Sequence, residues 1–234
     1  MRVESLVLEV TRRCNMCCEH CLRGDAQELN MTREIVDRVL DNIDEINQVT
    51  FTGGEPTLNL PIIEYFFERA EKLGKMPKSF YVATNGKLNQ EHLATLLLKQ
   101  YPKMEEKEMC GVGLSIDIYH MAQNDDDSMR DYDNSILKGL SFYTYDKENP
   151  RAERPERGVI PEGRARDWGE NHYRKLHDQI KISDDVIEML YVAANGNLIG
   201  DCDFSYDHID QLSEYDVWGF EELKYDYKTQ LYGD

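Results

Sequence analysis

The sequence is organised around Cys14-Asn15-Met16-Cys17-Cys18-Glu19-His20-Cys21, a stretch that holds four of the chain's six cysteines. Two spacings can be read from it. One is C-x3-C-x2-C, formed by Cys14, Cys18 and Cys21. The other is a C-x2-C pair, formed by Cys14 and Cys17 or by Cys18 and Cys21. A pair is typical of half a zinc site or of a redox dithiol, whereas three thiolates can hold a [4Fe–4S] cluster and leave one iron without a protein ligand.

The length and composition predict a single α/β domain with an acidic surface. The chain has 234 residues and a formal net charge of −18 at pH 7. This charge argues against a general nucleic-acid binder, but it leaves room for a nucleotide-sized ligand in a local basic pocket. Because the sequence shows no signal-peptide pattern and no apolar run of membrane length, we expect a cytoplasmic protein without a membrane partner. In that compartment clustered cysteines are more often metal ligands or catalytic groups than disulfides.

Apolar runs and turn signals alternate along the first half of the chain in the order β-α-β-α-β-α-β. Thr32 is the expected N-cap of the first helix, whose apolar spacing continues to Ile46, and Pro61 suits the first turn of the second helix. A third helix is expected at residues 90–99. Such alternation predicts an α/β fold, with a parallel sheet and outer helices, as an open sheet or a partial barrel. The expected strands cover residues 3–10, 49–52, 79–84 and 112–118.

Polar loops follow the expected strands, and each loop carries residues suited to binding. Because parallel strands end at one edge of a sheet, we expect these loops to lie close together. The loops are the cysteine stretch, Gly53-Gly54-Glu55-Pro56, Thr84-Asn85 and the segment from Asp117 to His120.

The pattern becomes irregular after His120. We expect a short helix at residues 135–140, a fifth strand at 141–145 and a possible short strand at 158–160. A hairpin is expected where two apolar runs, 189–194 and 197–199, flank the Asn195-Gly196 turn. We therefore expect a core of residues 1–188, with a C-terminal hairpin and acidic tail, residues 189–234, packed on it.

The C-x3-C-x2-C spacing after a first strand resembles the signature of the radical S-adenosylmethionine (radical SAM) enzymes. The lead-in Thr11-Arg12-Arg13 is also similar to that of the family. A second motif strengthens the resemblance, because the Gly-Gly-Glu-Pro loop at residues 53–56 resembles the family's "GGEP" motif in the expected place. The two motifs together select Cys14, Cys18 and Cys21 as ligands and leave Cys17 as an additional thiol. The resemblance implies a partial (β/α)6 barrel of parallel strands, similar to a TIM barrel, with a short C-terminal extension.

The same resemblance implies the cofactors and the chemistry. The three cysteines would hold a [4Fe–4S] cluster, whose open iron chelates the methionine part of SAM. Reductive cleavage of SAM, with an electron from a donor such as flavodoxin or ferredoxin, would give a 5′-deoxyadenosyl radical that removes a hydrogen atom from the substrate. Arg164 lies in a Gly-Arg-Ala stretch similar to one in peptide-modifying members, and its guanidinium suits the SAM carboxylate. The expected SAM-binding residues are Thr52, Gly53, Gly54, Glu55, Thr84, Asn85, Ser115, Asp117 and Arg164.

The substrate side of the prediction depends on Cys202 and His120. Residues 194–203 resemble the start of the cysteine-rich extension that holds auxiliary clusters in peptide-modifying relatives, but no cysteine follows Cys202. Cys202 is either a hydrogen-atom donor or proton carrier at the substrate or an inert buried thiol. His120 is either a catalytic residue or a structural histidine. A ribosomally made peptide is the first expected substrate and a nucleotide or small metabolite the second; the alternative class is a non-catalytic iron–sulfur or zinc module.

Overall fold

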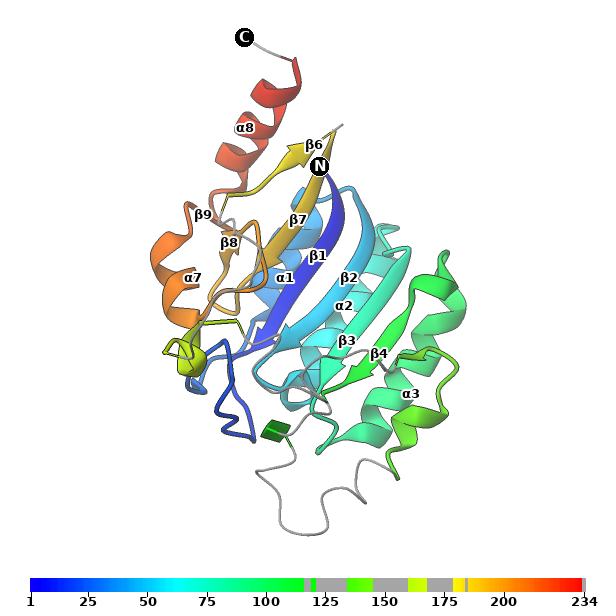
Figure 1. Ribbon diagram of the computed structural model, residues 1–234. Helices are drawn as coiled ribbons and strands as arrows, with labels where there is room; N and C mark the ends of the chain where they lie inside the picture. Colours follow the sequence, from blue (N-terminus) through cyan, green and yellow to red (C-terminus); the bar gives the residue numbers. More distant parts are fainter. Residues whose placement is uncertain (116–118, 121–133, 145–159, 168–178, 184, 233–234) are drawn as a thin grey trace.

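A computed structural model describes the chain outside residues 116–118, 121–133, 145–159, 168–178, 184 and 233–234 (Figure 1). Its centre is a sheet with the strand order β5-β4-β3-β2-β1-β7-β8-β9, and β6 pairs with β7 beside this path. All neighbouring strands from β5 to β7 run parallel, whereas the pairs β6–β7, β7–β8 and β8–β9 are antiparallel. The strands are β1 (Arg2–Thr11), β2 (Glu45–Gly53), β3 (Ser79–Thr84), β4 (Gly111–Leu114), β5 (Tyr143–Thr144), β6 (Ile182–Ser183), β7 (Val186–Val192), β8 (Asn197–Ile199) and β9 (Tyr215–Asp216).

The predicted α/β fold with a largely parallel sheet is confirmed, and among the described strands the sheet is not closed into a barrel. Strand β7 lies beside β1, in register from Arg2 opposite Val186 to Leu8 opposite Val192. The expected hairpin forms from β7 and β8. The expected domain boundary between residues 188 and 189 therefore falls inside a strand that continues the sheet from β1.

Three helices cover one face of the sheet and bury most of its apolar side chains (Figure 1). They are α1 (Arg33–Asn42), α2 (Leu60–Leu73) and α3 (Gln90–Gln100). Thr32 caps α1 as expected, since its side chain accepts a hydrogen bond from the Ile35 amide. The helical spacing expected to reach Ile46 is wrong, because Ile43 is already extended and Ile46 pairs with Val3 in the sheet. Pairing with β1 outweighs the local periodicity at this position.

The opposite face of the sheet carries a smaller apolar cluster under the C-terminal segment. Val7 points to this face, because its neighbours Leu6 and Leu8 point to the other one. It packs with residues of β7 and of α7 (Tyr206–Leu212). The last helix, α8 (Phe220–Tyr232), extends away from the sheet (Figure 1). No helix in the described ranges combines the length and apolarity needed to cross a membrane.

Short elements complete the fold and modify three expectations. The expected helix at 135–140 is a 3-10 turn, the fifth strand has two residues, and β4 begins at Gly111 and ends at Leu114. Residues 116–118 and most of the possible strand at 158–160 lie outside the described part of the chain. The 3-10 helices are η1 (Pro56–Asn59), η2 (Tyr101–Lys103), η3 (Lys107–Met109), η4 (Ile136–Gly139) and η5 (Gly163–Ala165).

Candidate cofactor site

The loops expected to meet at the carboxyl ends of the strands line one cavity of about 380 Å³. Thiols from the cysteine loop face residues that follow β2, β3 and β4, and the C-terminal segment supplies another part of the wall. Asp117 lies outside the described residues. The other candidates all line this cavity: Cys14, Cys18, Cys21, Thr52, Gly53, Gly54, Glu55, Thr84, Asn85, Ser115, His120, Arg164 and Cys202.

The residues that line the cavity distinguish the two interpretations of the cysteine spacing. Cys14, Cys18 and Cys21 line it, whereas Cys17 is exposed and is not among the lining residues. All six cysteines are free thiols. Burial raises the pKa of the Cys14 thiol. Three soft ligands on one wall are the donor set that an iron–sulfur cluster needs, so the residues present fit such a group.

Two glycines allow the Gly-Gly-Glu-Pro loop to approach the start of the cysteine loop. The Gly54 amide donates to the Thr11 carbonyl at 2.9 Å, and the Glu55 amide donates to the Arg13 carbonyl at 2.8 Å. A Cβ atom on Gly53, where φ is +143°, would lie 2.1 Å from the Thr11 oxygen. A Cβ atom on Gly54 would lie 2.4 Å from the Arg13 oxygen. Only glycine fits this contact, which couples the end of β2 to the cysteine loop.

Glu55 is buried and joins the ends of β2 and β3. Its Oε1 accepts from the Thr57 amide at 3.1 Å and from the hydroxyls of Thr57 and Thr84, each at 2.7 Å. Its Oε2 accepts from the Asn85 amide at 2.7 Å. Burial raises the pKa of the Glu55 carboxyl, while these donors favour its charged form. The contact expected between Glu55 and the SAM amino group stays a prediction, and Oε2, with one protein donor, is the oxygen better placed to accept it.

Arg164 supports the other end of the cysteine loop. Its Nη1 donates to the Cys18 carbonyl and its Nη2 to the Gly24 carbonyl, each at 2.9 Å, and Nε lies 3.2 Å from Asp25 Oδ1. Nη1 also lies 3.0 Å from the Cys17 sulfur. Gly163, at φ +55°, packs so closely that a Cβ atom would lie 2.4 Å from the Gly24 nitrogen. The expected pairing of Arg164 with the SAM carboxylate stays a prediction, because these contacts already engage its guanidinium.

Aromatic rings bring His120 beside the cysteine loop. The His20 ring stacks on Tyr119 with a centroid distance of 4.4 Å, and it meets the His120 ring edge-on at 5.2 Å. His20 stands between the expected ligands Cys18 and Cys21 in the sequence, and its side chain is buried. His120 thus lines the cavity beside the cysteine loop, and its expected catalytic role stays a prediction.

A buried ion-pair network under the cysteine loop was missed from the sequence. The Arg12 guanidinium donates through Nε to Glu9 at 2.7 Å and through Nη1 and Nη2 to Asp210 at 2.7 and 2.8 Å. It also lies over the Tyr206 ring, 4.6 Å from the centroid. Glu9 further accepts from the Tyr191 hydroxyl and from the Ala194 amide. One sequence signal could have indicated the network: Glu9 lies in an otherwise apolar strand, and a buried carboxylate requires a partner.

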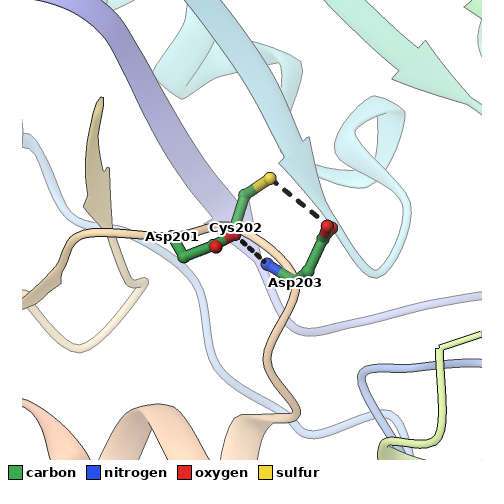
Figure 2. A group of neighbouring side chains, drawn as sticks. All are labelled: Asp201, Cys202 and Asp203. Atoms are coloured by element: carbon green, nitrogen blue, oxygen red, sulfur yellow. Dashed lines mark hydrogen bonds between the residues drawn. The ribbon is translucent and has the colours of Figure 1, made fainter. Parts of the chain in front are cut away.

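Cys202 lies between two aspartates in the loop before α7 (Figure 2). Its thiol donates to Asp203 Oδ1 at 3.6 Å, and the Asp203 amide donates to Asp201 Oδ1 at 3.1 Å. Possible ligand atoms of the three residues lie within 4.8 Å of one another. Burial and the neighbouring Asp203 charge raise the pKa of Cys202 to about 11. The Cys202 side chain is therefore a protonated thiol at neutral pH.

Alkylation of the anaerobic cluster-loaded protein by iodoacetamide should distinguish Cys202 from Cys17. At pH 8 a thiol with a pKa of about 11 is about 0.1% thiolate, so we expect Cys202 to react at least about tenfold more slowly than exposed Cys17. Its rate should rise as the pH increases towards 11. Peptide mass spectrometry measures both sites, with urea-unfolded protein as the reference in which the rates converge. Equal rates in the folded protein would contradict this environment for Cys202.

Comparison with known proteins gives a family model that matches the part of the chain lining the site. Residues 8–120 match the family model of the radical SAM superfamily. The uncharacterized protein MJ0907 of Methanocaldococcus jannaschii is 29% identical over 148 residues, which are 59% of this chain and 48% of that protein. The mitochondrial GTP 3′,8-cyclase of Arabidopsis thaliana is 25% identical over 119 residues, which are 48% of this chain and 28% of that protein. The chain thus spans about half or less of these relatives.

Solved structures give weaker similarities. BtrN in an open conformation has a TM-score of 0.46 at 13% identity, covering 98% of this chain and 86% of that one. Native anSMEcpe with bound AdoMet and a Cp18Cys peptide has a TM-score of 0.44 at 22% identity, covering 58% of this chain and 39% of that one. Streptococcus suis SuiB bound to the precursor peptide SuiA has a TM-score of 0.39 at 12% identity, covering 93% and 66%. The range that matches the radical SAM superfamily model, residues 8–120, holds the three cavity cysteines and the Gly-Gly-Glu-Pro loop.

Proposed function

We propose that this protein is a radical SAM enzyme that holds a [4Fe–4S] cluster through Cys14, Cys18 and Cys21. One observation carries the proposal: these three thiols and the Gly-Gly-Glu-Pro loop line the same cavity, while Cys17 does not. When bound, the cluster and SAM supply the reductive cleavage that gives a 5′-deoxyadenosyl radical for hydrogen-atom abstraction from a substrate. A scaffold or zinc module has no need of the glycine contacts that hold this second loop against the first.

The chain's own residues would bind and orient these groups. Gly53 and Gly54 bring backbone groups to the cavity wall, and Glu55 offers a carboxylate oxygen to a positively charged amine. Thr52, Thr84, Asn85, Ser115 and Arg164 line the same space and would complete the SAM site. Asp117 remains a proposed ribose contact from the sequence resemblance.

Cys202 and His120 are the proposed catalytic residues on the substrate side. Both line the cavity that holds the expected ligands. The protonated thiol of Cys202 can give up a hydrogen atom or a proton, which a thiolate cannot do. His120 carries an imidazole ring, a group that can accept or donate a proton.

The proposed substrate is a ribosomally made peptide, and the proposed electron donor is a flavodoxin or ferredoxin. The Gly163-Arg164-Ala165 stretch and the β7–β8 hairpin before Cys202 support the peptide, because both resemble features of peptide-modifying members. A nucleotide or other small metabolite is the second candidate, favoured by the relative named GTP 3′,8-cyclase.

Anaerobic reconstitution with iron and sulfide tests the proposal directly. We expect a brown protein with about four irons per chain, which forms 5′-deoxyadenosine from SAM and dithionite. Mass spectrometry measures the nucleoside, and absorption spectra measure the cluster. One zinc per chain, with no iron–sulfur absorption and no 5′-deoxyadenosine, would instead establish a non-catalytic metal module.

A further inference from the structure

Arg23 is a buried cation that lines the cavity with most of its hydrogen-bonding capacity unused. The residue is 8% exposed, and its Nη1 donates to the Phe204 carbonyl at 2.6 Å. Its guanidinium carbon lies 4.8 Å from the Tyr191 ring centroid. Across the described ranges, the guanidinium has no second hydrogen-bond acceptor and no carboxylate within 4.0 Å. Nε and Nη2 are therefore donors available to a molecule in the cavity.

No described carboxylate lies within 4.0 Å of the Arg23 guanidinium, although the Glu9 charge acts on it from a greater distance. Glu9 is engaged by Arg12, the Tyr191 hydroxyl and the Ala194 amide. Asp203 lines the same cavity but makes no ion pair with Arg23. The Arg164 guanidinium, by contrast, donates hydrogen bonds to loop carbonyls and forms an ion pair with Asp25. Because a buried and unpaired charge is costly, the arrangement is best satisfied by an anion from outside the chain.

The position of Arg23 indicates which molecule would bring that anion. Its anchors, Phe204 and Tyr191, belong to the loop before α7 and to β7, on the side of the sheet beyond β1. Cys202 and Met189 line the cavity from these same segments. The proposed SAM-binding residues come instead mainly from the ends of β2, β3 and β4. The unpaired guanidinium therefore lies on the side that remains for the substrate.

We propose that Arg23 binds a carboxylate or phosphate group of the substrate and so places the substrate beside Cys202. The inference rests on the proposed function, since it assigns one end of the same cavity. A planar guanidinium fork with two open donors suits either anion. In a peptide substrate the group would be an acidic side chain or the C-terminal carboxylate, and in a metabolite it would be a phosphate or carboxylate.

Inorganic phosphate serves as the probe. The cluster- and SAM-loaded protein is titrated with phosphate at constant ionic strength, and its melting temperature is recorded anaerobically. We expect saturable stabilisation of the wild type and at least about tenfold weaker half-saturation in Arg23→Gln, the loss expected for a charge-assisted hydrogen bond. Arg23→Lys keeps the charge, loses the fork and should lie between the two, and it replaces Arg23→Gln if that variant fails to fold. Arg2→Gln, at the far end of β1, is the matched control and should titrate like the wild type.

A second arm separates the substrate from SAM as the source of the anion. Equilibrium dialysis compares SAM with decarboxylated SAM, and we expect Arg23→Gln to change neither dissociation constant by more than about twofold. Loss of SAM binding alone, with decarboxylated SAM unaffected, would assign Arg23 to the SAM carboxylate and overturn the proposal. An equal phosphate response in wild type and variants, or no response in wild type, would also overturn it. Neither measurement needs turnover, so failure to form 5′-deoxyadenosine would count against the proposed function alone.

Discussion

Cys18→Ala is expected to abolish cluster binding, whereas Cys17→Ala should retain it. Cys18 is the buried central thiol of the three that share the cavity, while its neighbour Cys17 is exposed and points to Arg164. Removing one of three thiolates should lower iron from about four per chain to below about one and reduce 5′-deoxyadenosine formation more than about a hundredfold. Iron and sulfide analysis, with the nucleoside assay, measures both effects.

The pair of variants also tests the spacing itself, because the two substitutions are chemically identical and adjacent. Under the C-x2-C alternative that pairs Cys14 with Cys17, the sensitive residue would be Cys17 rather than Cys18. Iron loss in Cys17→Ala together with full iron in Cys18→Ala would therefore refute the C-x3-C-x2-C assignment. Circular dichroism of both apoproteins should match the wild type, because neither thiol is part of the main apolar core.

Arg12→Met is expected to be the most destabilising single substitution outside the apolar core. Arg12 and Glu9 are 1% and 0% exposed, so the variant leaves the Glu9 carboxylate buried without its cation. Breaking such a pair costs about 3–5 kcal/mol, and the remaining Tyr191 and Ala194 donors to Glu9 favour the lower end. Urea denaturation of the anaerobic protein measures the free energy of unfolding.

Two further variants give this prediction its controls. Arg2→Met removes an exposed ion pair between Arg2 of β1 and Glu45 of the neighbouring strand β2, and it should cost no more than about 1 kcal/mol. Glu9→Gln combined with Arg12→Met removes both charges and should recover part of the lost stability. If Arg12→Met lowered the free energy of unfolding no more than Arg2→Met does, the buried network would not contribute to stability. Since Asp210 on α7 pairs with Arg12, the variant should also loosen the C-terminal segment against the start of the cysteine loop.

Local patterns were reliable where one residue type has one physical role. Thr32 caps its helix as the sequence predicts, and the cysteine and Gly-Gly loops line one cavity at the ends of the strands, as expected of loops that follow parallel strands. The helical spacing through Ile46 failed, because an apolar residue at a helical interval fits a strand equally well. The partner strand of Ile46 decides between the two, and no local pattern identifies that partner.

The contacts of buried charged residues with residues far away in the sequence could not be predicted from the sequence. Arg12 and Asp210 are 198 positions apart, and Arg23 reaches Phe204 across 181. Taken alone in the sequence, each of the three charged residues resembles an ordinary surface charge, because burial is a property of the packed chain. The role expected for Arg164 shows the same limit, since its contacts with the cysteine loop depend on a close approach of Gly163 to Gly24.

The sequence by itself determined the α/β class, the match of residues 8–120 to the radical SAM family model and the spacing of the cysteines proposed as cluster ligands. Those properties follow from spacing along the chain, which folding does not alter. Only the tertiary structure showed that β7 extends the sheet from β1, that Cys17 is not among the cavity-lining cysteines and that Arg23 lines the cavity without an ion pair to a described residue. These depend on which distant segments come together to bury apolar surface, and that is decided by packing over the whole chain rather than by any stretch of it.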